Sequence, residues 1–326
     1  MNLFNSFWNY RNVSRLKRLM TTYAPDCIVS MNQADVKVTA LAARQLSIPY
    51  VPSVQNLRFF YGNPIFRSFK KWIYERLMQS ATLAICSSNA TADEHLDRFG
   101  LKHEKLVIIP NSIDCEYTRQ RADLSVRSEI RKNLGLADDA ILLVNTGRIS
   151  EQKGHLVLLN ALCQTAQFSD NERVHLLVVG SARESDLAHS KKVHDLHDKL
   201  KFKERIHFLG WRDDVPDILD ACDFYVHSAL WEGLPLAVLE AMACGLGILM
   251  TDCAGRLPNF VDGQHGWCVA KNDPEALAEG IQQVLKLDEV ERAEMGRAAR
   301  KLAMSHFDIK VNGARFVDEI EKVVSI

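Results

Sequence analysis

Several features that would assign a protein class on their own are missing from this sequence of 326 residues. No apolar run approaches the roughly 18 to 20 residues that a membrane-spanning helix needs. None of the eight cysteines is part of a Cys-x2-Cys pair, which argues against a zinc site and against a dithiol redox motif. No predicted strand is followed by Gly-x-Gly-x2-Gly, so an ordinary dinucleotide-binding dehydrogenase is a weak alternative.

The amino-terminus also lacks the charged-then-apolar order of an export signal. The cysteines are scattered, mostly within apolar segments, where buried thiols in a reducing compartment are the simplest interpretation. We therefore expect a cytoplasmic protein. With 47% hydrophobic and 25% charged residues, the composition is that of an ordinary folded protein, and the length favours two domains.

Acidic residues are scarce at the start of the chain. Residues 1–80 contain 11 Lys or Arg but three Asp or Glu, which gives a charge of +8. Since the whole chain carries −1, residues 81–326 carry −9. Such a split predicts that one domain meets an anionic surface.

What the sequence does contain is an alternation of short apolar runs with helical periodicities. The runs predict buried strands at 27–31, 50–54, 82–86 and 106–109, and then at 141–146, 175–179, 206–209, 224–227 and 247–251. Alternation of this kind is typical of parallel sheets with helices on both faces. The two series therefore predict an α/β protein with two Rossmann-like domains.

A turn-rich stretch follows the first series of strands, and residues 116–139 are highly charged without a sustained apolar period. We interpret 112–139 as a linker between an amino-terminal domain, 1–111, and a carboxyl-terminal domain, 140–308. A last helix at 309–326 follows a long helical pair, and its sequence does not say where it packs.

The first group of residues with chemical meaning lies where the strand 141–146 ends and a helix begins. Gly147 allows the backbone to turn tightly or to approach a ligand closely. Arg148 and Lys153 follow near the mouth of the strand, where open α/β sheets bind their ligands. A guanidinium that grips phosphate with two hydrogen bonds and a compact ammonium suit a diphosphate. Two solvated surface cations are the alternative, although a helix amino-terminus is mildly unfavourable for cations.

The second group lies at 226–245, where a strand leads through a loop into a helix. The backbone N–H groups of Gly233, Leu234 and the following turn would point at an anion. Glu232 lies in this loop, and Glu240 lies in an apolar helix, where a buried carboxylate needs a partner. Ribose or hexose hydroxyls would supply that partner, whereas capping of a neighbouring backbone amide is the alternative.

These residues resemble retaining glycosyltransferases of family 4, which have the GT-B fold. Four motifs occur in the family's order: Ile109-Pro110-Asn111, Gly147-Arg148 with Lys153-Gly154, Glu232-Gly233-Leu234-Pro235, and the pair Glu232-x7-Glu240. The resemblance implies a glycosyltransferase that uses a UDP- or GDP-sugar, retains its configuration and needs no metal ion or other cofactor. Consistently, no loop of the sequence contains Asp-x-Asp.

The resemblance also implies roles for individual residues. The catalytic group would contain two cations that neutralise the leaving diphosphate and a carboxylate that holds hydroxyls of the donor sugar: Arg148, Lys153 and Glu232. The donor would be bound further by residues at its phosphates and, in the last case, at its ribose: Gly147, Gly233, Leu234 and Glu240. On the acceptor side, Gln55 and Asn56 stand where the family often has a histidine.

The implied acceptor is a growing cell-surface polysaccharide, a lipopolysaccharide or a lipid-linked sugar, and we expect no nucleic-acid partner. The family usually opens with a strand and a glycine-rich loop, whereas residues 1–100 here contain two glycines. We therefore expect an incomplete amino-terminal domain with an unpaired sheet edge, poor transfer, and self-association or a need for a partner. A non-catalytic nucleotide-sugar-binding protein is the alternative function.

The segment 58–77 predicts a location at a membrane. A helix that begins near Asn63 and Pro64 places apolar residues on one face with basic residues around them. The apolar residues are Ile65, Phe66, Phe69, Trp72, Ile73 and Leu77, and the basic residues are Arg58, Arg67, Lys70, Lys71 and Arg76. Such a helix can lie in the interface of an anionic leaflet, which would make the protein peripheral on the inner face of the cell membrane. A core helix with one solvated face is the alternative.

Overall fold

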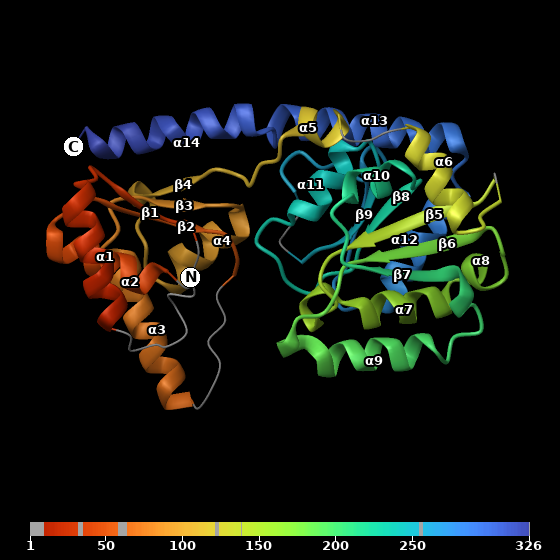
Figure 1. The fold of residues 1–326 in the computed structure, drawn as a ribbon, viewed down its shortest axis with the longest axis horizontal. Coiled ribbons are helices and arrows are strands. Elements are labelled where there is room, and N and C mark those ends of the chain that lie inside the picture. Colours follow the sequence, from red (N-terminus) through yellow and green to blue (C-terminus); the bar gives the residue numbers. More distant parts are fainter. Residues whose placement is uncertain are drawn as a thin grey trace. The chain divides into compact units, whose positions relative to one another are not determined.

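The computed structural model describes residues 10–31, 35–57, 64–120, 124–137, 139–253 and 257–325. The chain forms two compact units, and each is an α/β structure with its own sheet (Figure 1). The first unit comprises residues 1–111 and 311–326, and the second comprises residues 112–310. In the described part of the chain, no helix is both long enough and apolar enough to cross a membrane.

The first unit is built on a parallel sheet whose described strands follow the chain in the order β1-β2-β3-β4. These strands are β1 (Ile28–Ser30), β2 (Tyr50–Val54), β3 (Ala84–Cys86) and β4 (Leu106–Ile108). The helices are α1 (Tyr10–Tyr23), α2 (Val36–Leu46), α3 (Pro64–Gln79) and α4 (Asn89–Asp93), with a π-helical turn at Glu94–Arg98 and a 3-10 turn at His103–Lys105.

Apolar side chains pack on both faces of this sheet, because successive residues of a strand point to opposite sides. Val54 and Cys86 belong to a buried cluster that includes residues of α3. Val51 and Ile85 belong to another cluster, which includes Val323 of α14 (Ile309–Val324). The last helix, whose packing the sequence does not predict, therefore completes the core of the first unit.

The described strands of the second unit form a six-stranded parallel sheet in the order β10-β9-β8-β5-β6-β7. They are β5 (Ile141–Thr146), β6 (Val174–Val179), β7 (Ile206–Gly210), β8 (Phe224–His227), β9 (Gly247–Thr251) and β10 (Gly266–Val269). The helices are α5 (Cys115–Gln120), α6 (Leu124–Asn133), α7 (His155–Gln164), α8 (Ala166–Ser169), α9 (Leu187–His197), α10 (Val215–Asp220), α11 (Leu236–Ala243), α12 (Pro274–Lys286) and α13 (Glu289–His306). Short 3-10 turns lie at Glu151–Lys153, Glu184–Asp186 and Lys203–Arg205.

Helices cover both faces of the second sheet (Figure 1). Leu142 and Val144 of β5 are buried with residues of α10, α11 and α13. Leu143, which points the opposite way, is buried with residues of α7 and α12. The predicted fold class, α/β with parallel sheets in two Rossmann-like parts, is confirmed. Strand β10 was not predicted.

The segment 112–139, interpreted from its sequence as a linker, forms helices α5 and α6 within the second unit. Guanidinium nitrogens of Arg127 and Arg131 lie 3.2 and 3.4 Å from the two carboxylate oxygens of Asp223. Oδ2 of Asp223 also accepts a 2.7 Å hydrogen bond from the backbone N–H of Leu142 at the start of β5. Arg127 and Arg131, whose charges contributed to the linker interpretation, therefore attach α6 to the sheet.

Helix α3 contains most of the segment predicted to meet a membrane. Residues 58–63 and the side chains of 64–67 lie outside the described part, which therefore excludes Arg58, Ile65, Phe66 and Arg67 of the predicted surface. Tyr74 and Met78 are buried, whereas Phe69 and Trp72 are 43% and 52% exposed. The core-facing stripe therefore shares Leu77 with the predicted apolar face and otherwise differs from it, and two large aromatic side chains remain at the surface.

His175 of β6 and His207 of β7 form a pair whose stability depends on pH. Nδ1 of His175 lies 3.2 Å from Nε2 of His207, and the rings stack with centroids 5.4 Å apart. Burial, followed by the charges of His207 and Arg205, lowers the pKa of His175 to about 4, and burial also lowers the pKa of His207. Because both values fall below the ordinary value of about 6.5, the unfolded chain takes up more protons as the pH falls through this window.

We predict that acidification from pH 7 to pH 5 destabilises the wild type more than a His175→Gln variant. The neutral histidine pair makes its full contribution to the free energy of unfolding above about pH 6.5. That contribution is lost as the pH falls towards about 4. After allowance for solvent screening of a partly exposed ring, the difference is about 1 kcal/mol. Urea-unfolding midpoints at the two pH values measure it, with His103→Gln as a control at an exposed histidine. An equally steep loss in the His175 variant would show that the pair does not titrate in this range.

Candidate functional site

The topology of the second sheet locates a candidate site before any side chain is considered. The chain runs from β5 outward through β6 to β7 and then returns to the other side of β5 with β8. Open α/β sheets bind ligands outside the carboxyl ends of the strands at such a switch point. β5 and β8 pair through two pairs of residues, Leu143 with Phe224 and Val144 with Tyr225. Beyond them, Nδ2 of Asn145 donates to the backbone oxygen of Val226 at 2.8 Å, and the two chain segments then leave the sheet.

The loop after β5 lies close over the ends of the neighbouring strands because glycines leave room for it. A Cβ on Gly180 would lie 2.1 Å from the backbone oxygen of Gly147, and one on Gly147 would meet the side chain of Lys153 at 3.1 Å. Gly154 has φ +65°, and a Cβ there would lie 2.0 Å from the backbone oxygen of Ser228. The aliphatic part of the Lys153 side chain therefore packs against Gly147. At Gly154, the loop after β5 packs against the loop after β8.

Hydrogen bonds join these two loops, although they are far apart in the sequence. Oγ of Ser228 donates to the backbone oxygen of Lys153 at 2.9 Å. The backbone N–H of Leu230 donates to the backbone oxygen of Gln152 at 2.8 Å, and Nε2 of Gln152 donates to the backbone oxygen of Trp231 at 3.0 Å. The loops therefore form one surface, on which the charged residues of both are fixed relative to one another.

Lys153 and Glu232 form an ion pair at the centre of this surface. Nζ of Lys153 lies 2.7 Å from Oε1 of Glu232, and the two side chains are 15% and 9% exposed. The contact does not have hydrogen-bond geometry, and no other described group donates to this buried Oε1. The backbone of Glu232 is fixed because its N–H donates to the oxygen of Cys253 at 3.0 Å. The structure thus brings together two predicted site residues and leaves a carboxylate oxygen able to accept a hydrogen bond.

Arg148 lies in the same loop as Lys153 and is more open to solvent. Its Nη1 lies 3.2 Å from Oδ2 of Asp186, with side chains 37% and 20% exposed. Its Nη2 donates to Oε1 of Gln152 at 3.4 Å, which is a long hydrogen bond. Asp186 and Gln152 were not recognised in the sequence, because the first lies 38 residues away and the second presents no charge.

Glu240 lies within α11, beyond the turn that contains Gly233 and Leu234. Burial raises the pKa of its carboxyl group, and the nearby charge of Lys153 partly offsets that rise. Of the predicted residues, Gly147, Glu232 and Glu240 therefore lie near one cation, the side chain of Lys153. They lie at a buried end of the sheet, where charge–charge interactions are stronger than in water.

A row of buried polar groups on β5 and β8 was not predicted from the sequence. Oγ1 of Thr146 lies 3.1 Å from the hydroxyl of Tyr225, which lies 3.5 Å from Nδ1 of His227. Burial, with the charges of Lys153 and His155, lowers the pKa of His227 well below its ordinary value, so the imidazole is neutral. Its Nε2 has no hydrogen-bond partner among the described residues. Polar residues at the ends of otherwise apolar strands are the signal that could have found them.

Gln55 and Asn56, predicted on the acceptor side, follow β2 in the first unit. Nε2 of Gln55 donates to Oγ of Ser53 at 2.5 Å, and Oγ of Ser87 donates to the backbone oxygen of Gln55 at 3.4 Å. These contacts attach Gln55 to the ends of β2 and β3 and leave its acceptor role a prediction.

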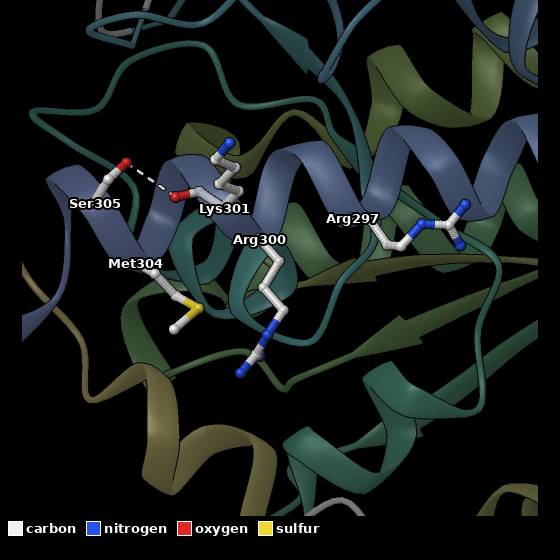
Figure 2. A pocket seen from close by; sticks show the side chains of 5 residues that line it. All are labelled: Arg297, Arg300, Lys301, Met304 and Ser305. Atoms are coloured by element: carbon white, nitrogen blue, oxygen red, sulfur yellow. Dashed lines mark hydrogen bonds between the residues drawn. The ribbon is translucent and has the colours of Figure 1, made fainter.

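A groove of about 380 Å³ along α13 is separate from the cluster at the strand ends (Figure 2). Side chains of one helix line it: Arg297, Arg300, Lys301, Met304 and Ser305. Arg300 donates to the backbone oxygen of Ala243, which places a cation at the carboxyl end of α11. None of the predicted site residues lines this groove, and at least one of its cations has a structural partner.

Family models match both parts of the chain. Residues 126–302 match the family described as glycosyl transferases group 1, and residues 2–117 match glycosyltransferase family 4. The chain is 24% identical over 326 residues to UDP-Gal:alpha-D-GlcNAc-diphosphoundecaprenol alpha-1,3-galactosyltransferase of Escherichia coli, covering 96% of this chain and 80% of that protein.

Two further similarities extend over nearly the whole chain. It is 26% identical over 335 residues to N,N'-diacetylbacillosaminyl-diphospho-undecaprenol alpha-1,3-N-acetylgalactosaminyltransferase of Campylobacter jejuni, covering 98% of this chain and 83% of that protein. Among solved structures, HepE of Anabaena in complex with UDP-glucose has a TM-score of 0.83 and 23% identity, covering 95% of this chain and 82% of that one.

We predict that Gly154→Ala disrupts the joined loops far more than Gly210→Ala. Both glycines have a positive φ, +65° and +67°, so an alanine suffers similar backbone strain of about 1 to 2 kcal/mol at each. At Gly210 a Cβ meets nothing within 4 Å, whereas at Gly154 it would lie 2.0 Å from the oxygen of Ser228. Urea unfolding should show an additional loss of at least about 2 kcal/mol for Gly154→Ala. Equal losses would mean that the two loops do not pack as closely as described.

Proposed function

Since the chain belongs to the glycosyl transferases group 1 family, we propose that it transfers a sugar from a nucleoside diphosphate to a glycan or lipid-linked acceptor. The observation that carries the proposal is that Arg148, Lys153 and Glu232 lie on joined loops at the β5–β8 switch point, with Glu240 of α11 close enough to feel the charge of Lys153. The cations would bind the diphosphate there, and the carboxylates would accept hydrogen bonds from the hydroxyl groups of the ribose and the sugar.

The diphosphate would lie between Arg148 and Lys153. A planar guanidinium can hold a phosphate with two hydrogen bonds, and an ammonium adds a compact charge. Both lie at the switch point before the ligand arrives, so their charges are close to where negative charge develops on the leaving diphosphate. In this proposal the two cations replace a divalent metal ion, and the transfer retains the configuration of the sugar.

The two glutamates would divide the hydroxyl groups of the donor. Glu240 is a half-buried carboxylate in α11, and burial disfavours its charge unless hydrogen-bond donors reach it. Ribose hydroxyls would supply those donors. Glu232 lies beside Lys153 and hence beside the terminal phosphate, where the transferred sugar begins. Gly233 and Leu234 would offer backbone N–H groups to the phosphates.

Relatives favour particular donors and acceptors for this site. The Escherichia coli protein is named for UDP-Gal and a diphosphoundecaprenol-linked sugar, and the HepE structure contains UDP-glucose. A UDP-sugar is therefore preferred over a GDP-sugar as the donor, and a polyprenyl-diphosphate-linked sugar is the preferred acceptor. Cell-surface polysaccharide synthesis is the setting that such an acceptor implies.

Attachment to an anionic membrane would bring the chain to such an acceptor, and α3 presents a suitable surface. Phe69 and Trp72 are exposed and stack with ring centroids 6.1 Å apart, and the guanidinium of Arg76 lies 5.6 Å from the Trp72 ring. Lys70 and Lys71 lie on the same helix. Aromatic rings with basic residues around them are typical of segments that lie in a membrane interface.

We predict that Arg148→Ala and Lys153→Ala each weaken binding of UDP more than binding of uridine. Removing either cation takes positive charge away from the diphosphate site, leaves its carboxylate partner uncompensated there and keeps the nucleoside contacts in place, so UDP should lose about tenfold or more and uridine less than about twofold. Calorimetric titration measures both ligands, and slow release of UDP from UDP-glucose by the wild type measures catalysis. Equal losses for both ligands would separate the cations from the phosphates, and binding without any release would favour the non-catalytic alternative.

We predict salt-sensitive binding to vesicles that contain anionic lipid, and its loss in a Lys70→Gln/Lys71→Gln variant. Each basic residue near an anionic leaflet contributes about 1 kcal/mol, so two changes should weaken binding about 30-fold at moderate salt. Lys191→Gln/Lys192→Gln, at two adjacent exposed lysines of α9, is the matched control and should bind like the wild type. Equal binding to neutral and anionic vesicles would rule out electrostatic attachment.

A further inference from the structure

Both cations of the site are already in contact with carboxylates. Lys153 lies 2.7 Å from Glu232, and Arg148 lies 3.2 Å from Asp186. The formal charges of these four side chains add to zero, so the group by itself does not attract a diphosphate strongly. A diphosphate that binds here has to share or displace both carboxylates.

Burial makes the cost of that displacement unequal for the two pairs. Arg148 and Asp186 are 37% and 20% exposed, and an ion pair open to water is worth little. Lys153 and Glu232 are 15% and 9% exposed, and removing one partner of a buried pair leaves an uncompensated charge. Arg148 can therefore turn to a phosphate at a small cost in free energy. When Lys153 turns away, in contrast, the charge of Glu232 is left buried without a partner.

The geometry limits how Glu232 can respond. Its backbone is held by the oxygen of Cys253, and the backbone of Lys153 is held by Ser228, so the exchange is confined to the side chains. The buried Oε1 has no hydrogen-bond donor among the described residues. A carboxylate in this position needs donors as soon as the ammonium turns away, and the hydroxyl groups of a sugar on the terminal phosphate are donors at the right place.

We propose that the Lys153–Glu232 pair makes phosphate binding depend on the sugar, an inference that rests on the proposed function. Lys153 moves to the diphosphate when sugar hydroxyls replace it on Glu232. A nucleoside diphosphate without a sugar leaves Glu232 without partners, so it competes poorly with the ion pair. The pair therefore discriminates the intact donor from the spent nucleoside diphosphate and promotes release of that product after transfer.

Calorimetric titration of UDP and UDP-glucose against the wild type, Glu232→Gln and Asp186→Asn tests the proposal. Glutamine removes the buried charge, so UDP should bind more tightly and UDP-glucose more weakly. The ratio of the UDP dissociation constant to that of UDP-glucose should fall at least about tenfold. Asp186→Asn removes the carboxylate from the other cation, affects both ligands alike, and should change the ratio by less than about twofold.

Both dissociation constants come from the same sample, so an unfolded fraction lowers the stoichiometry and leaves their ratio unchanged. Should Glu232→Gln not fold, Glu232→Asp withdraws the carboxylate from the ammonium and should lower the ratio in the same direction. An unchanged ratio in the Glu232 variant, or an equal fall in Asp186→Asn, would overturn this inference while the proposed function stands. If the wild type binds none of UDP, UDP-glucose, GDP and GDP-glucose, both the proposed function and this inference are overturned.

Discussion

Strands β5 and β8 are neighbours through two register pairs, after which they separate, continue for two residues beside β6 and β9 respectively, and then leave the sheet. The arrangement of the site depends on this separation. It allows the loop after β5 and the loop after β8 to lie against each other, with Gly154 packed on the backbone of Ser228 and Gln152 hydrogen-bonded to both Leu230 and Trp231. Charged side chains that are 79 residues apart in the sequence, Lys153 and Glu232, are thereby held in contact in a nearly dry environment.

The charges around this junction are balanced by local groups rather than by solvent. The imidazole of His227 is neutral because it is buried beside Lys153, and the carboxyl of Glu240 has a raised pKa because it is buried, although Lys153 partly offsets that rise. A single ammonium thus affects two carboxylates and an imidazole. In such a site a ligand exchanges partners with the protein, and its affinity depends on whether it satisfies every group that it releases.

Much of the second unit follows from its sequence. The central strands are mainly apolar runs, and the segments after them carry Gly147, Arg148 and Glu232 in positions that an open α/β sheet uses for ligands. Strand β10 could not be predicted in the same way, because Gly266–Val269 opens on a glycine and lies, only partly buried, at the edge of the sheet. Segment 112–139 resembles a linker because its charges are visible in the sequence, whereas Asp223, the partner of Arg127 and Arg131, is 96 and 92 residues away from them.

The least predictable features are the contacts between distant residues. The sequence indicates that Arg148, Lys153, Glu232 and Glu240 share a site, and it does not indicate that Lys153 pairs with Glu232 or Arg148 with Asp186. For helix α3, periodicity selects Phe69 and Trp72 as part of an apolar face, and the structure buries Tyr74 and Met78 instead. A helix with more than one apolar stripe can be buried on either, and the sheet against which it packs makes the choice.

The most direct test of this account is a crystal structure of the protein with UDP-glucose bound. The account predicts the diphosphate at the carboxyl ends of β5 and β8, with Nζ of Lys153 on a phosphate oxygen and Oε1 of Glu232 on a hydroxyl of the glucose. A diphosphate bound elsewhere, for example in the basic groove along α13, would contradict it. So would a complex at the predicted place in which Lys153 and Glu232 remain in contact and neither touches the ligand.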